Sequence, residues 1–302
     1  KIMSIASIQA KYPSAIWFDS NYVGTNSGTL AQPYDNLNTA IGQSNTNAKV
    51  IAIKDGAHTV AQIGGNGSSS NFQMQGSATK LSLVGESTGA ILNFSGDNFG
   101  TAINFRGETN SQIHLETLKL VQNSSGNNYR VIFGGNDAAS TITVENCILK
   151  MGADSLGASS NAGWFGGPTS QVTTLSISNT VISGATGATA NALIIGTADV
   201  GGFNVFNVEN STIINVSGSA NTLSKKTSFT SAIFKNNIFV GTGSNSETLN
   251  YTPSTQGGNC YHNTGISSGS GGVVFADPLF IDSANDDYRL RPGSPCLNVG
   301  VA

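Results

Sequence analysis

Short segments of alternating apolar and polar residues recur along the chain at a nearly constant interval. The clearest are TVEN, SISN, NVEN, IFKN and CYHN, each closed by an asparagine. Successive asparagines are 33, 31, 26 and 27 residues apart. A repeat that keeps its type while its length varies is typical of stacked coils joined by surface loops of different size. These asparagines, called the asparagine column below, are Asn146, Asn179, Asn210, Asn236 and Asn263.

Apolar residues occupy the positions two and four before the column residues, and this register continues toward the N-terminus through Asp55, Gly85 and Thr117. Side chains of a strand point alternately to two faces, so this pattern predicts one strand per coil with a buried face. Further apolar runs, such as residues 131–135 and 192–196, predict another strand per coil. The predicted buried pairs are Ile51/Ile53, Leu81/Leu83, Ile113/Leu115, Ile142/Val144, Leu175/Ile177 and Phe206/Val208.

The pattern predicts an all-β protein, a right-handed parallel β-helix (solenoid) of about eight full coils with a short N-terminal capping segment. The right hand is the one that crossovers between parallel strands favour. A sharp turn between two strands requires left-handed backbone, which asparagine tolerates better than other residues with a side chain. Stacked side-chain amides can also hydrogen-bond to one another. We therefore expect the asparagine column to form a ladder of amides at one turn.

The surface is polar without being highly charged. Charged residues make up 10% of the 302-residue chain, and the formal net charge is -3. The longest basic run is the pair Lys225 and Lys226, which excludes a nucleic-acid partner. No stretch approaches the roughly eighteen apolar residues that a membrane span needs. The cysteines, Cys147, Cys260 and Cys296, have no metal-binding spacing, and the sequence leaves their disulfide status open.

Two segments resemble the ends of known β-helix proteins. Residues 15–41, AIWFDSNYVGTNSGTLAQPYDNLNTAI, resemble the segment that caps the first coil in secreted right-handed parallel β-helix proteins of the pectate-lyase-like superfamily. Residues 275–300 resemble the segment that closes the last coil. The resemblance implies this fold and an extracellular, cell-surface or virion-surface location, usually in a carbohydrate-related setting. With the repeat, it divides the chain into an N-terminal arm (1–14), a capping segment (15–45), the coils (46–272) and an exit segment (273–302).

The N-terminal arm begins with the apolar segment KIMSIASIQA (1–10), which contains no acidic residue and is compatible with a strand. The end of a solenoid exposes a strand edge that must be covered. We therefore expect residues 1–10 to pack against an end coil or a neighbouring subunit.

The outward position just before each column residue carries much of the chain's charge. Five of these eight positions are charged, although charged residues are only 10% of the chain. Neighbouring coils lie about 4.8 Å apart, so Glu116 is expected to stack on Glu145, with Glu209 about 10 Å from Glu145. We call the set the charged column: Lys54, Val84, Glu116, Glu145, Ser178, Glu209, Lys235 and His262.

If the protein is an enzyme, the candidate catalytic residues are Glu116, Glu145, Glu209, Lys235 and His262. Carboxylates about 5 Å apart suit a retaining glycosidase, whereas a separation near 10 Å is at the upper limit for an inverting one. A polysaccharide lyase needs a base, here Lys235 or His262, and a cation that neutralises the substrate carboxylate. Calcium held by Glu145 and Glu209 is the candidate cation. The lyases that the chain resembles place an arginine or lysine beside a dense acidic calcium cluster, but no arginine falls in the charged column.

Two functional hypotheses follow. The first is a non-catalytic extracellular structural or surface protein of the adhesin, filament or virion type, which binds a glycan, associates with itself and needs no cofactor. The second is a polysaccharide lyase or glycoside hydrolase that acts on an extracellular glycan, with calcium as its candidate cofactor. The low charge and the lack of an arginine in the charged column favour the first hypothesis.

Overall fold

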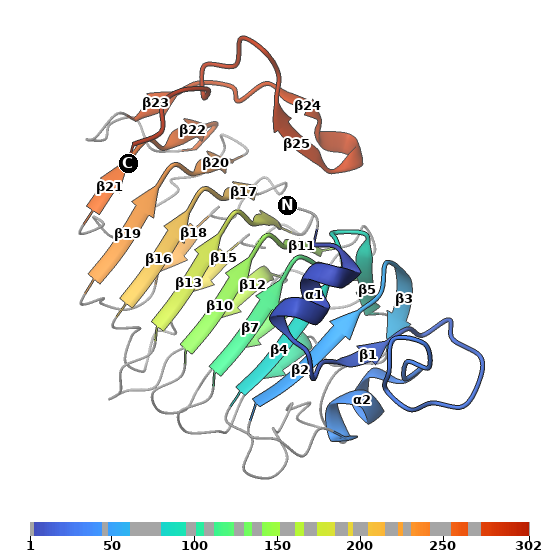
Figure 1. Ribbon diagram of the computed structural model, residues 1–302. Helices are drawn as coiled ribbons and strands as arrows, with labels where there is room; N and C mark the ends of the chain where they lie inside the picture. Colours follow the sequence, from blue (N-terminus) through green and yellow to red (C-terminus); the bar gives the residue numbers. More distant parts are fainter. Residues whose placement is uncertain are drawn as a thin grey trace.

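The computed structural model describes most of the repeating segments and both ends of the chain, which together form one elongated solenoid (Figure 1). The described residues are 3–43, 48–60, 80–94, 101–105, 112–123, 130–134, 141–151, 161–165, 174–184, 193–195, 205–214, 223–225, 231–241, 255–264 and 273–301.

The first sheet runs the whole length of the solenoid and faces the viewer in Figure 1. Within the described residues it has nine strands, all parallel to their neighbours. In spatial order they are β1 (Ile16–Phe18), β2 (Ala48–Ile53), β4 (Lys80–Gly85), β7 (Gln112–Glu116), β10 (Thr141–Glu145), β13 (Thr174–Ser178), β16 (Val205–Glu209), β19 (Ser231–Lys235) and β21 (Thr255–Gly257).

Directly after the turns that close the first-sheet strands, the described part of the chain forms a second parallel sheet, with nine strands. Its strands are β3 (Gly56–Val60), β5 (Ala90–Phe94), β8 (Lys119–Gln122), β11 (Ile148–Met151), β14 (Val181–Ser183), β17 (Thr212–Ile214), β20 (Ile238–Val240), β22 (Cys260–His262) and β23 (Val274–Phe275). The third sheet contains β6 (Thr101–Phe105), β9 (Arg130–Gly134), β12 (Asn161–Phe165), β15 (Leu193–Ile195) and β18 (Leu223–Lys225).

Neighbours within each sheet come from successive coils, which confirms the predicted parallel β-helix. The predicted number of full coils is wrong. The third sheet has five strands in the described part of the chain, so five coils there run through all three sheets instead of about eight. The other coils supply strands to the first two sheets only, within the same residues.

The core lies between the sheets and is built by the predicted inward residues. Ile51, Leu83, Leu115 and Val208, for example, are completely buried. Burying one such side chain contributes about 1.5 to 3 kcal/mol relative to leaving it exposed. At the C-terminal end, the core contains a series of aromatic rings in contact, Phe206, Phe234, Phe239 and Tyr261. The 43% exposed ring of Phe275 stacks on Tyr261.

The turns after β10, β13, β16 and β19 have the left-handed backbone that the asparagine column predicts. The φ angles are 55° at Asn146, 48° at Asn179, 51° at Asn210 and 58° at Asn236. Thr117 adopts the same conformation, with φ of 56°. Local steric demand therefore explains why asparagine recurs at this position.

The predicted column has the wrong register at both ends. Asn263 has a φ of 49° but follows β22 in the second sheet, whereas the first-sheet position after Asn236 belongs to Gly258, with φ of 63°. At the other end, Ile53 and not Asp55 pairs with Gly85. The error at Asn263 arises because strands of both sheets show the same alternation, so periodicity alone cannot tell one sheet from the next. The error at Asp55 arises because Ile51, Ala52 and Ile53 are all buried, so alternation does not mark the register at the end of β2.

The predicted ladder of column amides is also wrong, because the stacked polar side chains lie one position later. Among the described residues, no hydrogen bond joins the amides of two column residues. The backbone N–H of Cys147 donates to Thr180 Oγ1, that of Thr180 to Ser211 Oγ, and that of Ser211 to Asn237 Oδ1. The N–H of Asn237 continues to Asn259 Oδ1 at 2.9 Å. We call this chain the buried ladder, because all five residues are at most 2% exposed.

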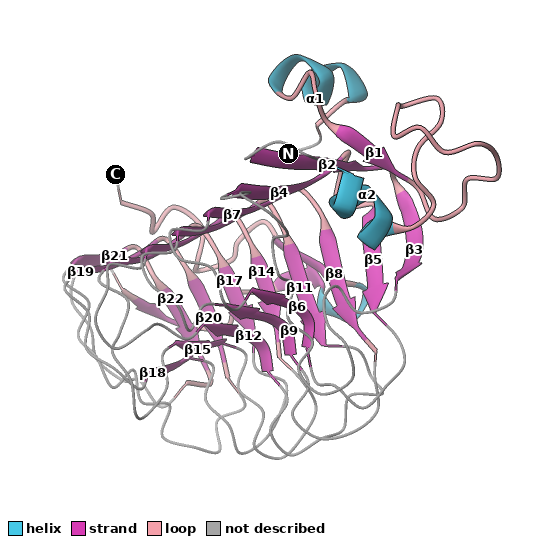
Figure 2. Cartoon of the chain, turned by 90° about the horizontal axis from the view of Figure 1, so that it is seen from below, coloured by secondary structure: helices cyan, strands magenta, loops and turns pink. Residues whose placement is uncertain are grey.

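The two α-helices found among the described residues lie at the N-terminal end of the solenoid (Figure 2). Helix α2 (Leu37–Gln43) closes the core with Leu37, Ala40 and Ile41. The arm is not a strand as its sequence suggested, because residues Ile5–Lys11 form helix α1. Ser4 caps this helix by accepting a hydrogen bond from the N–H of Ser7. Neither helix is long and apolar enough to cross a membrane, a finding that covers the described residues.

Helix α1 packs on the outer face of the first coils, so the prediction that the arm covers an end coil is confirmed. Met3 and Ile8 form a small apolar cluster with Trp17, Ala52 and Val84. Ala52 and Val84 alternate with the core residues of β2 and β4, and therefore point outward under the helix.

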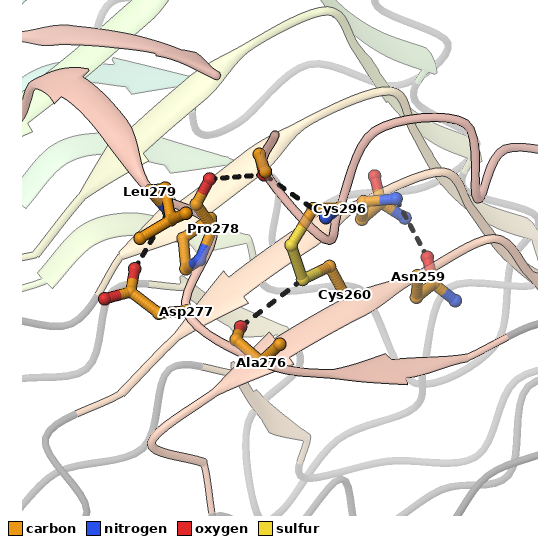
Figure 3. Close-up of a disulfide and its surroundings, with 9 residues drawn as sticks. Asn259, Cys260, Ala276, Asp277, Pro278, Leu279 and Cys296 are labelled. Atoms are coloured by element: carbon orange, nitrogen blue, oxygen red, sulfur yellow. Dashed lines mark hydrogen bonds between the residues drawn. A yellow bond between two sulfur atoms is a disulfide. The ribbon is translucent and has the colours of Figure 1, made fainter. Parts of the chain in front are cut away.

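The exit segment folds back over the second sheet. Strands β24 (Phe280–Asp282) and β25 (Asp287–Leu290) form an antiparallel hairpin around a 3-10 turn (Ser283–Asn285). Lys119 on β8 and Lys150 on β11 both contact Asp286 of this hairpin. A disulfide between Cys260 and Cys296 attaches the end of the segment to the last coils (Figure 3).

Candidate functional site

The outer face of the first sheet collects most of the predicted charged column. Strand pairing aligns Glu116 with Glu145, Ser178 lies between Glu145 and Glu209, and Lys235 follows Glu209. His262 is the exception among the five predicted catalytic residues, because it lies on β22 of the second sheet opposite Val240. Lys54 also falls outside the charged column, because Ala52 holds that register position.

Five residues form a compact cluster where α1 meets this face. Lys11 Nζ donates to both carboxylate oxygens of Glu116, at 2.7 and 2.8 Å. The Tyr12 hydroxyl donates to Glu116 Oε2 at 2.8 Å. His114 Nε2 lies 2.7 Å from Glu145 Oε1 and 3.9 Å from Glu116 Oε2. Glu116 is therefore held by contacts with the arm and is not free on a solvated face.

Burial differs sharply within the cluster. The Glu116 side chain is 7% exposed, whereas that of Lys11 is 47% exposed. Burial lowers the pKa of Lys11, but hydrogen bonds to Glu116 and Tyr12 outweigh it and leave the pKa raised. Burial and the hydrogen bond to Glu116 raise the pKa of Tyr12. The raised pKa of Lys11 keeps a positive charge beside the nearly buried side chain of Glu116.

The cluster contains a set of potential metal ligands. One ligand atom from each of His114, Glu116 and Glu145 can be chosen so that all lie within 4.8 Å of one another. An imidazole with two carboxylates suits a divalent ion such as Zn²⁺. However, Lys11 already supplies the positive charge beside Glu116. The structure thus groups Glu145 with His114 and Glu116, and not with Glu209 as the predicted calcium site required.

These contacts fasten α1 to the sheet. Lys11 is the last residue of α1, and Tyr12 is its C-cap. Glu116 accepts three hydrogen bonds from these two side chains. Sequence reasoning missed both residues because it treated the arm as strand-compatible. The available signal was Ser4 followed by apolar residues at helical spacing, Ile5 and Ile8, with a lysine in the last turn.

Replacing Lys11 with methionine should loosen α1. The substitution keeps the aliphatic stem but leaves the Glu116 carboxylate without its cation. Removal of one partner of a buried pair costs several kcal/mol, and because Lys11 is half exposed we expect about 2 to 3 kcal/mol. Amide hydrogen exchange of α1 measures this loss. The control is Gln9→Met on the same helix, because Gln9 is exposed and its replacement should leave exchange unchanged. If exchange were accelerated equally in both variants, Lys11 would not fasten the helix.

A second candidate site is an open groove of about 620 Å³ between the turns of the coils and the exit hairpin. Asn146 and Asn179 of the asparagine column line it from the turns, and Tyr288 and Arg289 line it from β25. We call the lining residues that begin β11, β14 and β17 the floor of the groove: Ile148, Val181 and Thr212.

Ion pairs hold the hairpin wall of this groove in place. Burial raises the pKa of Asp286, but hydrogen bonds from Lys119 and Lys150, at 2.8 and 2.6 Å, outweigh it and leave the pKa lowered. Arg289 donates to both oxygens of Asp287, which likewise lowers the pKa of that carboxyl. The acidic groups of the wall are therefore paired with cations.

Comparison of the chain with known protein families, with curated proteins and with solved structures finds no significant match. The parallel β-solenoid is therefore established by the structure itself, and function must be argued from the two sites.

Proposed function

We propose that this protein is an extracellular, non-catalytic β-helix that binds a glycan on its surface. The observation that carries the proposal is the fixed pairing of one candidate catalytic group: Glu116 is 7% exposed and accepts hydrogen bonds from both Lys11 and Tyr12. A general acid or base must reach the substrate and exchange a proton with it. Glu116 instead fastens helix α1, and this structural role is sufficient to explain why a glutamate occupies the position.

The cysteines support an extracellular location. Disulfides persist in oxidising compartments and are rare in the cytosol. The bond between Cys260 and Cys296 attaches the exit segment, while Cys147 remains a buried free thiol. The polar, weakly charged surface supports the same location, as does the resemblance to secreted β-helix proteins of the pectate-lyase-like superfamily. Self-association is part of the proposal and can be measured by sedimentation velocity.

A polysaccharide lyase or hydrolase is the second candidate, and one contact favours it. His114 and Glu145 form a pair with Nε2 and Oε1 2.7 Å apart, and they are less buried than Glu116. A carboxylate that orients an imidazole is a common arrangement for a general base. Tyr12 lies close to this pair through its hydrogen bond to Glu116.

Incubation with uronate-containing and neutral polysaccharides distinguishes the two candidates. Lyase activity produces unsaturated, ultraviolet-absorbing ends, and hydrolase activity produces new reducing ends. We expect neither product from the wild type, together with retention of the protein on at least one immobilised polysaccharide. Product formation that disappears in His114→Gln or Glu145→Gln would instead establish the enzyme.

A further inference from the structure

The groove beneath the exit hairpin has a shape that follows the coils. Its floor residues Ile148, Val181 and Thr212 occupy equivalent register positions on three consecutive strands of the second sheet. Adjacent strands lie about 4.8 Å apart, so the first and third positions are about 10 Å apart along the solenoid. A ligand in this groove therefore meets the same type of surface at regular intervals.

Backbone groups on the floor are already paired between coils. The N–H groups of Ile148, Val181 and Thr212 donate to carbonyl oxygens of the preceding coil at 2.9 to 3.0 Å. A peptide that binds by strand addition needs free backbone donors and acceptors. Since the floor offers a sheet face, recognition must come from side chains.

The side chains that line the groove suit hydroxyl groups. Asn146 and Asn179 hold left-handed turns, and their amides make no hydrogen bond to another residue in the described part of the chain. Each amide offers two donors and an acceptor. The two amides recur at the coil spacing, which is close to the length of one pyranose ring in an extended glycan. A chain of sugars could thus place similar hydroxyls opposite successive amides.

Charge and apolar surface narrow the class of ligand. Asp286 is paired with Lys119 and Lys150, and Asp287 with Arg289, so each of these charged side chains already has a partner of opposite charge. Ile148 and Val181 give the floor an apolar character, and Tyr288 adds an aromatic side chain that lines the groove. Such surfaces pack against the C–H faces of sugar rings, while polar groups at the edges fix their orientation.

We propose that this groove binds a neutral oligosaccharide of hexopyranose units, extended along the solenoid with one sugar per coil. The inference rests on the proposed glycan-binding function and assigns its site and ligand class. In it, the amides of Asn146 and Asn179 bind successive sugar hydroxyls, and the exit hairpin forms the opposite wall.

Calorimetric titration with cellohexaose, mannohexaose and hexagalacturonic acid tests the assignment. We expect a neutral hexasaccharide to bind more tightly than the acidic one. The double variant Asn146→Gly with Asn179→Gly should weaken binding about tenfold or more, since each lost hydrogen bond is worth roughly fivefold. Glycine preserves the left-handed backbone, so the fold should be retained. Asn179→Asp, which keeps the size and removes the donor, should also weaken binding and provides a second test.

Asn210→Gly is the matched control, because Asn210 has the same left-handed turn and is exposed but does not line the groove. Its affinity should equal that of the wild type. Unchanged affinity in the double variant, or equal losses in the double variant and the control, would overturn the site. Preference for the acidic probe, or binding of none of the three, would overturn the ligand class. Cleavage of a polysaccharide would instead contradict the proposed function, so the two failures are distinguishable.

Discussion

Replacing Asn237 with alanine is expected to destabilise the solenoid by about 2 to 4 kcal/mol, because it leaves two buried backbone groups without partners. Asn237 is fully buried; its Oδ1 accepts from the N–H of Ser211, and its Nδ2 donates to the Val208 carbonyl at 2.8 Å. Denaturant unfolding followed by circular dichroism measures the change in the free energy of unfolding.

The control for Asn237 is Asn210→Gly, which removes an exposed amide and keeps the left-handed turn. Its unfolding free energy should lie within about 0.5 kcal/mol of the wild type, as expected for a surface change. If both variants lost the same stability, the buried ladder would have no special role. The comparison therefore separates the buried ladder from the exposed asparagine column.

Removing the disulfide should cost a similar amount. Cys260 and Cys296 are 36 residues apart, and closing a loop of that length stabilises a protein by about 2 to 4 kcal/mol. We expect Cys260→Ala with Cys296→Ala to lower the free energy of unfolding by that amount and to make the exit segment sensitive to protease. Asn236 also holds this segment through two hydrogen bonds to Val301, so the segment should stay folded at low temperature.

Two controls accompany the cysteine variant. Reductant should bring the wild type to the stability of the double variant and leave the double variant unchanged. Cys147→Ala removes a buried thiol that is not in a disulfide. Reductant should lower the stability of this variant by the same amount as it lowers the stability of the wild type. A double variant as stable as the wild type would show that the exit segment is held without the disulfide.

The sequence predicts the parts of this fold that depend on local demands. Inward pairs such as Leu175 and Ile177 are recognisable because strand geometry imposes a period of two. The left-handed turns at Asn146 and Asn179 are recognisable because few residues with a side chain tolerate that backbone. The short second-sheet strands that follow the turns are not recognisable as separate strands in the sequence, because no loop separates them from the first-sheet strands.

Long-range contacts explain what the sequence could not predict. Lys11 meets Glu116 across 105 residues, and Lys119 meets Asp286 across 167 residues. Neither pairing leaves a periodic signal, because each depends on how an end segment folds back over the coils. The register error at Asn263 has a different origin: its coil is closed by Gly258, so the expected asparagine is missing from the first-sheet turn.

In the proposed function, the solenoid holds an intact glycan beside its exit hairpin, and the charged cluster beneath α1 fastens that helix to the coils. A crystal structure of the wild type soaked with the tightest-binding hexasaccharide tests this most directly. We predict continuous density for an uncleaved chain between Asn146 and Asn179 on one side and Tyr288 on the other, with Lys11 still bound to Glu116. Density for sugar or cleaved product at His114 and Glu145, with the groove free of ligand, would contradict the account.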